Sequence, residues 1–190
     1  MPWANGRGTT LEIIAFPAPN AWTWRLSLAT VSSDGPFSRL DGVDRHLAVA
    51  EGAGMVLQIN DVEHHLCTYE SLSFPGEAET VCALLDGSVR DLNLMVRRAA
   101  GSGELRVQQC VRGERIATED LAALVVLDGA VAVSTPSPGF PGTPVRERAG
   151  RFDAFVADDK TDDRTHTFAR FGSVATAVVA SVVALVSVKP

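Results

Sequence analysis

Lysine, cysteine and histidine are scarce in this 190-residue sequence, and each scarcity argues against a class of function. Lys160 is the only lysine ahead of Lys189, and 17 basic residues face 23 acidic ones, which gives a formal net charge of −6. The basic residues form no stripe that could follow a phosphate backbone. We therefore expect no nucleic-acid partner.

The four histidines do not form a metal-binding pattern. The sequence has no HxH motif, and the adjacent His64 and His65 would point to opposite faces of a strand, so they could not chelate one ion together. We interpret these two residues as polar turn histidines that follow Asp61. The sequence predicts no bound metal and no cofactor.

The cysteines and the first residues favour a cytoplasmic protein. The three cysteines form no CxxC motif, and Cys82 and Cys110 lie in apolar segments, where a free thiol usually behaves as a small hydrophobe. A disulfide between two cysteines remains the alternative, in an oxidising compartment. No basic and apolar leader follows Met1, which argues against export.

The sequence has one long uncharged run, at residues 173–188, and its composition argues against a membrane span. A spanning helix needs about 20 predominantly apolar residues. This run is shorter, is interrupted by Ser and Thr, and is rich in valine, which favours strands over helices. We predict a buried strand, or two strands joined by a tight bend, and a C-terminal membrane anchor is the minority alternative.

Motifs for covalent catalysis and for phosphate binding are also missing. The sequence has no GxSxG, no SxxK, and no cysteine beside an obvious base. The glycine pairs Gly6/Gly8 and Gly52/Gly54 do not stand between a strand and a long helix, as a dinucleotide-binding loop requires. We expect them to form tight turns.

What the sequence does contain is a series of short runs in which apolar and polar residues alternate. In residues 21–30 two tryptophans and two leucines fall on one face, and Arg25 lies on the other. Strands are also predicted at residues 46–51, 55–60, 80–85, 89–96, 104–111, 123–127, 130–134, 152–157 and 165–171. Many short strands separated by turn residues indicate an all-β sandwich or barrel.

Signals for helices and for domain boundaries are weak. The best helix candidate is a single turn at residues 118–123. The stretch AAGSG at 99–103 and the Pro/Gly-rich stretch at 135–150 interrupt the strand pattern. We predict a single unit of residues 1–190 with two strand-rich halves, approximately 1–100 and 104–190.

Polar side chains occur in predicted strands, where they could line a pocket. Asp91 and Asn93 share one face of residues 89–96, and the apolar residues share the other. In a sandwich such a polar face usually meets solvent, whereas in a closed barrel it can line a cavity. Asn5 and Thr10 near the N-terminus are further candidates.

Arginine is the residue type that could give such a pocket a ligand preference. Arg25 and Arg45 are the candidates, and an isolated arginine is usually an exposed charge. A guanidinium inside a pocket instead offers a planar fork that suits a carboxylate.

The first hundred residues resemble the HutD/Ves family in the order and spacing of several segments. The matching segments are WANGRGTTLE at 3–12, WRLSLA at 24–29, SDGPFS at 33–38, DR at 44–45, EGAGM at 51–55, FPG at 74–76 and LLDGSVRDLN at 84–93. Two positions depart from the family pattern: relatives commonly have Lys where this chain has Ala4, and Gly where it has Arg7.

This resemblance implies a cupin-like double β-barrel, or bicupin, and a role in histidine utilisation or in stress response. It brings no established enzymatic activity. It suggests formylglutamate, an intermediate of histidine breakdown, as a ligand, with Arg45 as the arginine associated with it. It further implies that Asn5, Thr10, Arg25, Asp91 and Asn93 line the pocket.

Three functions remain open from the sequence. The leading hypothesis is a metal-free binding protein for a small carboxylate such as formylglutamate. The second is a cofactor-free isomerase or hydrolase that uses Asp91 or Glu12 as general base, which requires an enclosed carboxylate with a raised pKa. The third is a regulatory interaction protein, and strand edges leave a homodimer as an open alternative for any of them.

Overall fold

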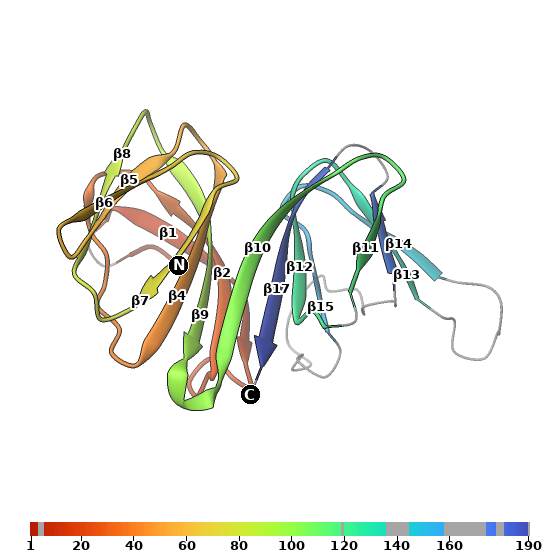
Figure 1. Ribbon diagram of the computed structural model, residues 1–190, viewed down its shortest axis with the longest axis horizontal. Coiled ribbons are helices and arrows are strands. Elements are labelled where there is room, and N and C mark those ends of the chain that lie inside the picture. Colours follow the sequence, from red (N-terminus) through yellow and green to blue (C-terminus); the bar gives the residue numbers. More distant parts are fainter. Residues whose placement is uncertain (4–5, 119, 136–144, 158–173, 178–180, 190) are drawn as a thin grey trace. The chain divides into compact units, whose positions relative to one another are not determined.

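The computed structural model describes residues 1–3, 6–118, 120–135, 145–157, 174–177 and 181–189 of the chain (Figure 1). The chain divides into two compact units, of which unit 1 is Met1–Leu105 with Val188–Pro190 and unit 2 is Arg106–Ser187. Among the described residues the only helix is the 3-10 turn η1 (Arg98–Ala100). The fold is all-β and cupin-like, as expected.

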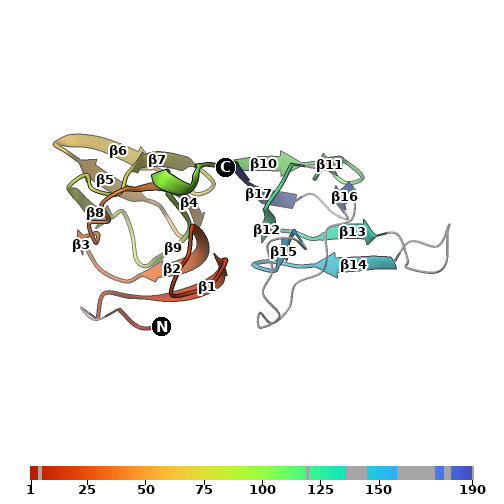
Figure 2. The same cartoon turned by 90° about the horizontal axis from the view of Figure 1, so that it is seen from below.

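Unit 1 consists of two antiparallel sheets that face each other (Figure 2). The first has the order β1 (Gly8–Phe16), β2 (Trp24–Val31), β9 (Val89–Arg97), β4 (Val43–Glu51) and β7 (Ser71–Pro75). The second has the order β3 (Gly35–Pro36), β8 (Thr80–Leu84), β5 (Met55–Ile59) and β6 (Val62–Leu66). Sequence order therefore differs from spatial order, and β9 lies at the centre of the first sheet.

One part of the interior of unit 1 is filled by hydrocarbon side chains. Leu47 and Val49 of β4 pack with Met55 and Leu57 of β5, and none of the four side chains is exposed. Burial of this kind contributes about 1.5–3 kcal/mol for each large aliphatic side chain. The cluster joins the two sheets and leaves the polar positions of the same strands outside the packed core.

The opposite face of the first sheet is buried as well. Trp24, Leu26 and Leu28 of β2 and Leu92 and Leu94 of β9 are at most 3% exposed. The alternation predicted for β2 and β9 is confirmed, because the apolar residues share one face and the polar residues share the other. Both faces are shielded from solvent from Leu26 to Ala29 of β2 and from Asp91 to Val96 of β9.

Unit 2 also contains two sheets, and each of them has four strands. One has the order β10 (Ser102–Cys110), β17 (Ser181–Lys189), β12 (Ala123–Asp128) and β15 (Ala154–Val156). The other has the order β11 (Arg115–Ala117), β16 (Val174–Ala177), β13 (Val131–Thr135) and β14 (Val145–Ala149). The pairs of sheets in the two units fit the double barrel that the family resemblance implies.

The uncharged run at residues 173–188 contains strand, as predicted. It supplies β16 and most of β17, and residues 178–180 between them lie outside the described part of the chain. In the described residues no helix has the length and apolar character needed to cross a membrane. Cys82 and Cys110 are buried and form no disulfide, which agrees with their expected role as small hydrophobes.

One local prediction was wrong, and a second is confirmed in part. His64 and His65 belong to strand β6 and are not turn residues, because β6 pairs through them with Val56 and Leu57 of β5. The helical turn expected at 118–123 is a single hydrogen-bonded turn, in which the Leu121 amide donates to the Thr118 carbonyl at 3.1 Å, and β12 begins directly after it. The strand predicted at 165–171 lies outside the described residues.

Gly54, in the turn between β4 and β5, is expected to tolerate no side chain. Its φ of +113° is disfavoured for other residues, and a Cβ atom there would lie 2.3 Å from the Leu66 carbonyl oxygen. Gly54→Ala should lower the free energy of unfolding by about 3 kcal/mol or more. Gly42→Ala is the control, because Gly42 also has a positive φ but an added Cβ there would meet nothing within 4 Å, and it should cost about 1 kcal/mol. Urea unfolding of both variants measures the difference, and equal losses would contradict the steric argument.

Candidate functional site

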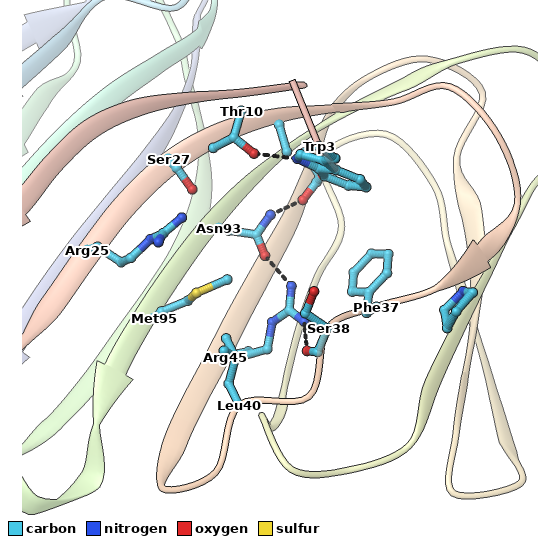
Figure 3. A pocket seen from close by; sticks show the side chains of 13 residues that line it. Trp3, Thr10, Arg25, Ser27, Phe37, Ser38, Leu40, Arg45, Asn93 and Met95 are labelled. Atoms are coloured by element: carbon cyan, nitrogen blue, oxygen red, sulfur yellow. Dashed lines mark hydrogen bonds between the residues drawn. The ribbon is translucent and has the colours of Figure 1, made fainter. Parts of the chain in front are cut away.

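Unit 1 contains a cavity of about 360 Å³ on the inner side of its first sheet (Figure 3). Its wall combines charged, amide, hydroxyl and aromatic groups from five strands (β1, β2, β3, β4 and β9), the N-terminal segment and the loop after β3. The lining residues are Trp3, Thr10, Arg25, Ser27, Ala29, Pro36, Phe37, Ser38, Leu40, Arg45, Asp91, Asn93 and Met95.

The strand register explains why these polar residues meet. Met95 of β9 pairs with Arg25 of β2 on one side and with Arg45 of β4 on the other. Residues that pair across neighbouring strands point to the same face of a sheet, so both guanidinium groups arise from one row. Asn93 and Asp91 follow on the same face of β9 at intervals of two residues.

Arg45 is held inside the barrel and is only 6% exposed. Its Nη2 donates to Asn93 Oδ1 at 3.3 Å and its Nη1 to the Ser38 carbonyl oxygen at 3.5 Å. The guanidinium carbon lies 4.8 Å from the ring centre of Phe37 and 5.3 Å from that of Phe74. Among the described residues nothing accepts a hydrogen bond from its Nε.

Burial lowers the pKa of Arg45, but the side chain keeps its positive charge at neutral pH. Desolvation lowers the pKa of this guanidinium to about 10, while Asp91 opposes the shift and Arg25 adds to it. The side chain therefore stays protonated at neutral pH. A cation with so little water around it interacts strongly with any anion that enters the cavity.

Asp91 is fully buried and is linked to Arg45 through Asn93. The Asn93 amide donates from Nδ2 to Asp91 Oδ2 and accepts from Arg45 through Oδ1 (Figure 3). Burial raises the pKa of the Asp91 carboxyl to about 7, and the charge of Arg45 and the Asn93 hydrogen bond limit the rise. Within the described part of the chain, Asp91 Oδ1 has no hydrogen-bond partner.

Arg25 supplies a second cation to the cavity wall. Its guanidinium carbon lies 5.9 Å from the ring centre of Trp22, and its Nε is buried without a hydrogen-bond partner among the described residues. In Figure 3 the side chain extends toward Ser27 and Asn93. The cavity thus has guanidinium groups on both sides of Met95.

Thr10 has a more specific position than the sequence suggested. Its Oγ1 accepts a hydrogen bond from the indole Nε1 of Trp3 at 2.7 Å, so that it fixes the aromatic wall of the cavity. Asn5 and Ala4 lie outside the described residues. Arg7 does not line the cavity, and its guanidinium lies against Gly35.

Sequence reasoning missed several parts of the wall. Ser27 and Met95 could have been found, because they alternate with Arg25 and Asn93 on strands whose period had been recognised. Phe37, Ser38 and Leu40 come from a loop, where no periodicity indicates direction. Glu12, the other carboxylate considered as a base, is not part of the wall.

The donor set of the cavity suits an organic anion. Its charged groups are two guanidinium groups and one carboxylate, and its remaining polar groups are amide and hydroxyl. No three His, Cys, Asp or Glu side chains come together as potential metal ligands in the described ranges. Two arginines would also repel a cation.

Comparison with known proteins identifies the family of this chain. The family model described as HutD matches residues 1–173. The chain belongs to the HutD family. Protein Ves from Citrobacter koseri is 35% identical over 108 residues, which cover 55% of this chain and 56% of that protein. An uncharacterised 21.2 kDa protein in the hutC 3′ region of Pseudomonas putida is 37% identical over 98 residues, covering 50% of this chain and 52% of that protein.

The chain spans about half the length of the curated HutD relatives it matches. A solved structure shows similarity over the whole chain: a conserved protein of unknown function from Pseudomonas aeruginosa PAO1 has a TM-score of 0.76 and 28% identity. That match covers 100% of this chain and 92% of the other. The HutD fold thus includes both units.

Asp91 should make the folded protein less stable as pH rises. The unfolded chain releases the Asp91 proton near its ordinary pKa of 3.8, whereas in the folded protein the pKa is about 7. Between these values folding takes up a proton, so the contribution of Asp91 to stability falls as pH rises and is lost above about 7. The free energy of unfolding of Asp91→Asn, measured relative to that of the wild type, should therefore rise by about 3 kcal/mol from about pH 5 to pH 8.

Chemical denaturation of both proteins at the two pH values measures this gain. Asp41→Asn, at an exposed carboxylate, serves as control and should show no comparable change. A constant difference between wild type and Asp91→Asn would mean that Asp91 titrates as it does in the unfolded chain.

Proposed function

We propose that this protein binds a small organic carboxylate in the cavity of unit 1, with Arg45 as the main anchor. The observation that carries the proposal is a guanidinium that is 6% exposed, lines a cavity of about 360 Å³ and has a free Nε donor among the described residues. A buried charge of this kind is costly unless an anion or hydrogen-bond acceptor meets it.

Arg25 supports a ligand with two acidic ends. It lies in the same row as Arg45, on the other side of Met95, and its Nε is also unpaired among the described side chains. Each charged hydrogen bond to a carboxylate contributes roughly 1.5–3 kcal/mol. Two such anchors suffice for affinities of about micromolar to millimolar.

Formylglutamate is the ligand we favour, in an accessory or regulatory role in histidine utilisation. It is a small dicarboxylate, and a relative from Pseudomonas putida is named for its place in the hutC 3′ region. The size of the cavity lies within the range of small-molecule sites. The apolar rings of Phe37 and Trp3 would contact the carbon chain between the two carboxylates.

N-formylglutamate should stabilise the wild-type protein against heat. At a hundred times its dissociation constant a ligand adds about 2.7 kcal/mol, which corresponds to roughly 5–10 °C in Tm for a chain of this size. Glutamate and urocanate are compared in the same scan. The absence of a shift with all three compounds, in a cooperatively folding protein, would count against carboxylate binding.

Arg45→Gln should lose this stabilisation, because glutamine removes the cation and leaves a shorter, neutral polar side chain. Arg39→Gln is the matched control, since Arg39 is exposed and pairs only with Asp41 in the described structure. The expected result is a loss of at least about tenfold in affinity for Arg45→Gln and none for Arg39→Gln, measured by calorimetry. Equal affinities would show that the ligand is held elsewhere.

A cofactor-free isomerase or hydrolase is the second candidate, and one observation favours it. Asp91 is a fully buried carboxyl on a cavity wall with a pKa raised to about 7, which is the range in which a general base operates well. Turnover of a bound carboxylate that disappears in Asp91→Asn, with ligand affinity retained, would establish this activity. Equal turnover in the variant would exclude Asp91 as the base.

A further inference from the structure

One oxygen of Asp91 has no partner in the barrel wall. Asn93 donates to Oδ2, but the residues that pair with Asp91 on its two sides are Ala29 and Val49, whose side chains carry no polar atom. Throughout the described residues nothing donates to Oδ1. The side chain is 0% exposed, and Asp91 is among the residues that line the cavity.

A ligand in the cavity that Asp91 lines can supply the donor that this oxygen lacks. A buried carboxylate oxygen without a hydrogen bond costs more free energy than a neutral group, so native proteins rarely leave one unpaired. The two flanking strands present only alkyl groups at this level, and rotation of the carboxyl is restrained by Asn93. We therefore expect the donor for Oδ1 to come from a bound ligand and not from the protein.

The unpaired groups of the cavity form a mixed set. Arg45 Nε and Arg25 Nε are donors with positive charge, and Asp91 Oδ1 is an acceptor that is anionic above its pKa. A plain carboxylate satisfies the arginines and leaves Oδ1 unpaired, and it also brings a like charge toward it. A carboxylate that carries an N–H satisfies donors and acceptor together.

The geometry points to Asp91 as a residue that determines ligand specificity: its Oδ1 accepts a hydrogen bond from an amino or amido N–H of the bound carboxylate. The ligand class is thus the amino- or amido-substituted carboxylates. This inference rests on the proposed function, because the arginines hold the carboxylate end of the same ligand. Sites built to pair with an N–H strongly reject analogues that lack it.

An isosteric pair of ligands tests this role on the wild-type protein. N-formylglutamate and its ester analogue 2-formyloxyglutarate differ in one group, an N–H that becomes an oxygen without hydrogen. Calorimetry at about pH 8.5 keeps a carboxyl of pKa about 7 ionised. The ester should bind about 10- to 100-fold more weakly, because it removes a charged hydrogen bond and faces Oδ1 with a lone pair.

The variant Asp91→Asn distinguishes Asp91 from other contacts of the N–H. Asn93 accepts from Arg45 through Oδ1, which fixes its amide and directs its Nδ2 toward residue 91. The new amide should therefore turn its oxygen to Asn93 and its NH₂ to the cavity. The preference for N-formylglutamate should disappear or reverse, whereas Asp41→Asn at the surface should keep it.

Each outcome has a separate meaning. Equal binding of the two ligands by the wild type, or a preference that survives in Asp91→Asn, overturns the role of Asp91 and leaves carboxylate binding intact. If neither ligand binds, the proposed function and this inference fall together. If Asp91→Asn does not fold, which its melting curve without ligand reveals, the wild-type comparison of the two ligands decides alone.

Discussion

The Asn93 amide bridges two opposite charges inside the barrel, and the character of the site depends on this bridge. Arg45 and Asp91 are both almost without water, and each would be costly alone. The amide accepts from the cation and donates to the anion, so each charge is partly compensated without direct contact. The remaining Nε and Oδ1 atoms are buried without a partner among the described residues, and they belong to side chains that line the cavity.

This arrangement requires a sheet whose two faces are both enclosed. The outer residues of β2 and β9 are large and apolar, and their burial holds the sheet in place. The inner residues can then be polar without a loss of stability that would unfold the barrel. Leu47 and Val49 of β4 pack in the hydrocarbon cluster, and the cavity extends along β9 from the level of Met95 to that of Asp91.

The sequence predicts the strands and the direction of their side chains better than it predicts the site. Alternation in β2 and β9 indicated the faces of Arg25, Asp91 and Asn93, since the period of two follows from backbone geometry. It could not show that Arg25 and Arg45 share one row, because β4 and β9 are far apart in sequence and their register depends on the whole sheet. The loop residue Phe37 has no periodic signal at all. Arg45 was a candidate from the sequence, but it precedes the strand predicted at residues 46–51, so alternation did not indicate the direction of its side chain.

The N-terminal segment forms a part of the cavity wall that is attached at the edge of the first sheet. Trp3 is attached to β1 by its backbone amide, which donates to Gly8 at 2.9 Å, and by its indole bond to Thr10. Such an attachment at a sheet edge opens at a lower free energy than the central strand β9, whose residues pair on both sides. The part of the cavity wall that Trp3 forms is therefore less stable than the part formed by the central strands.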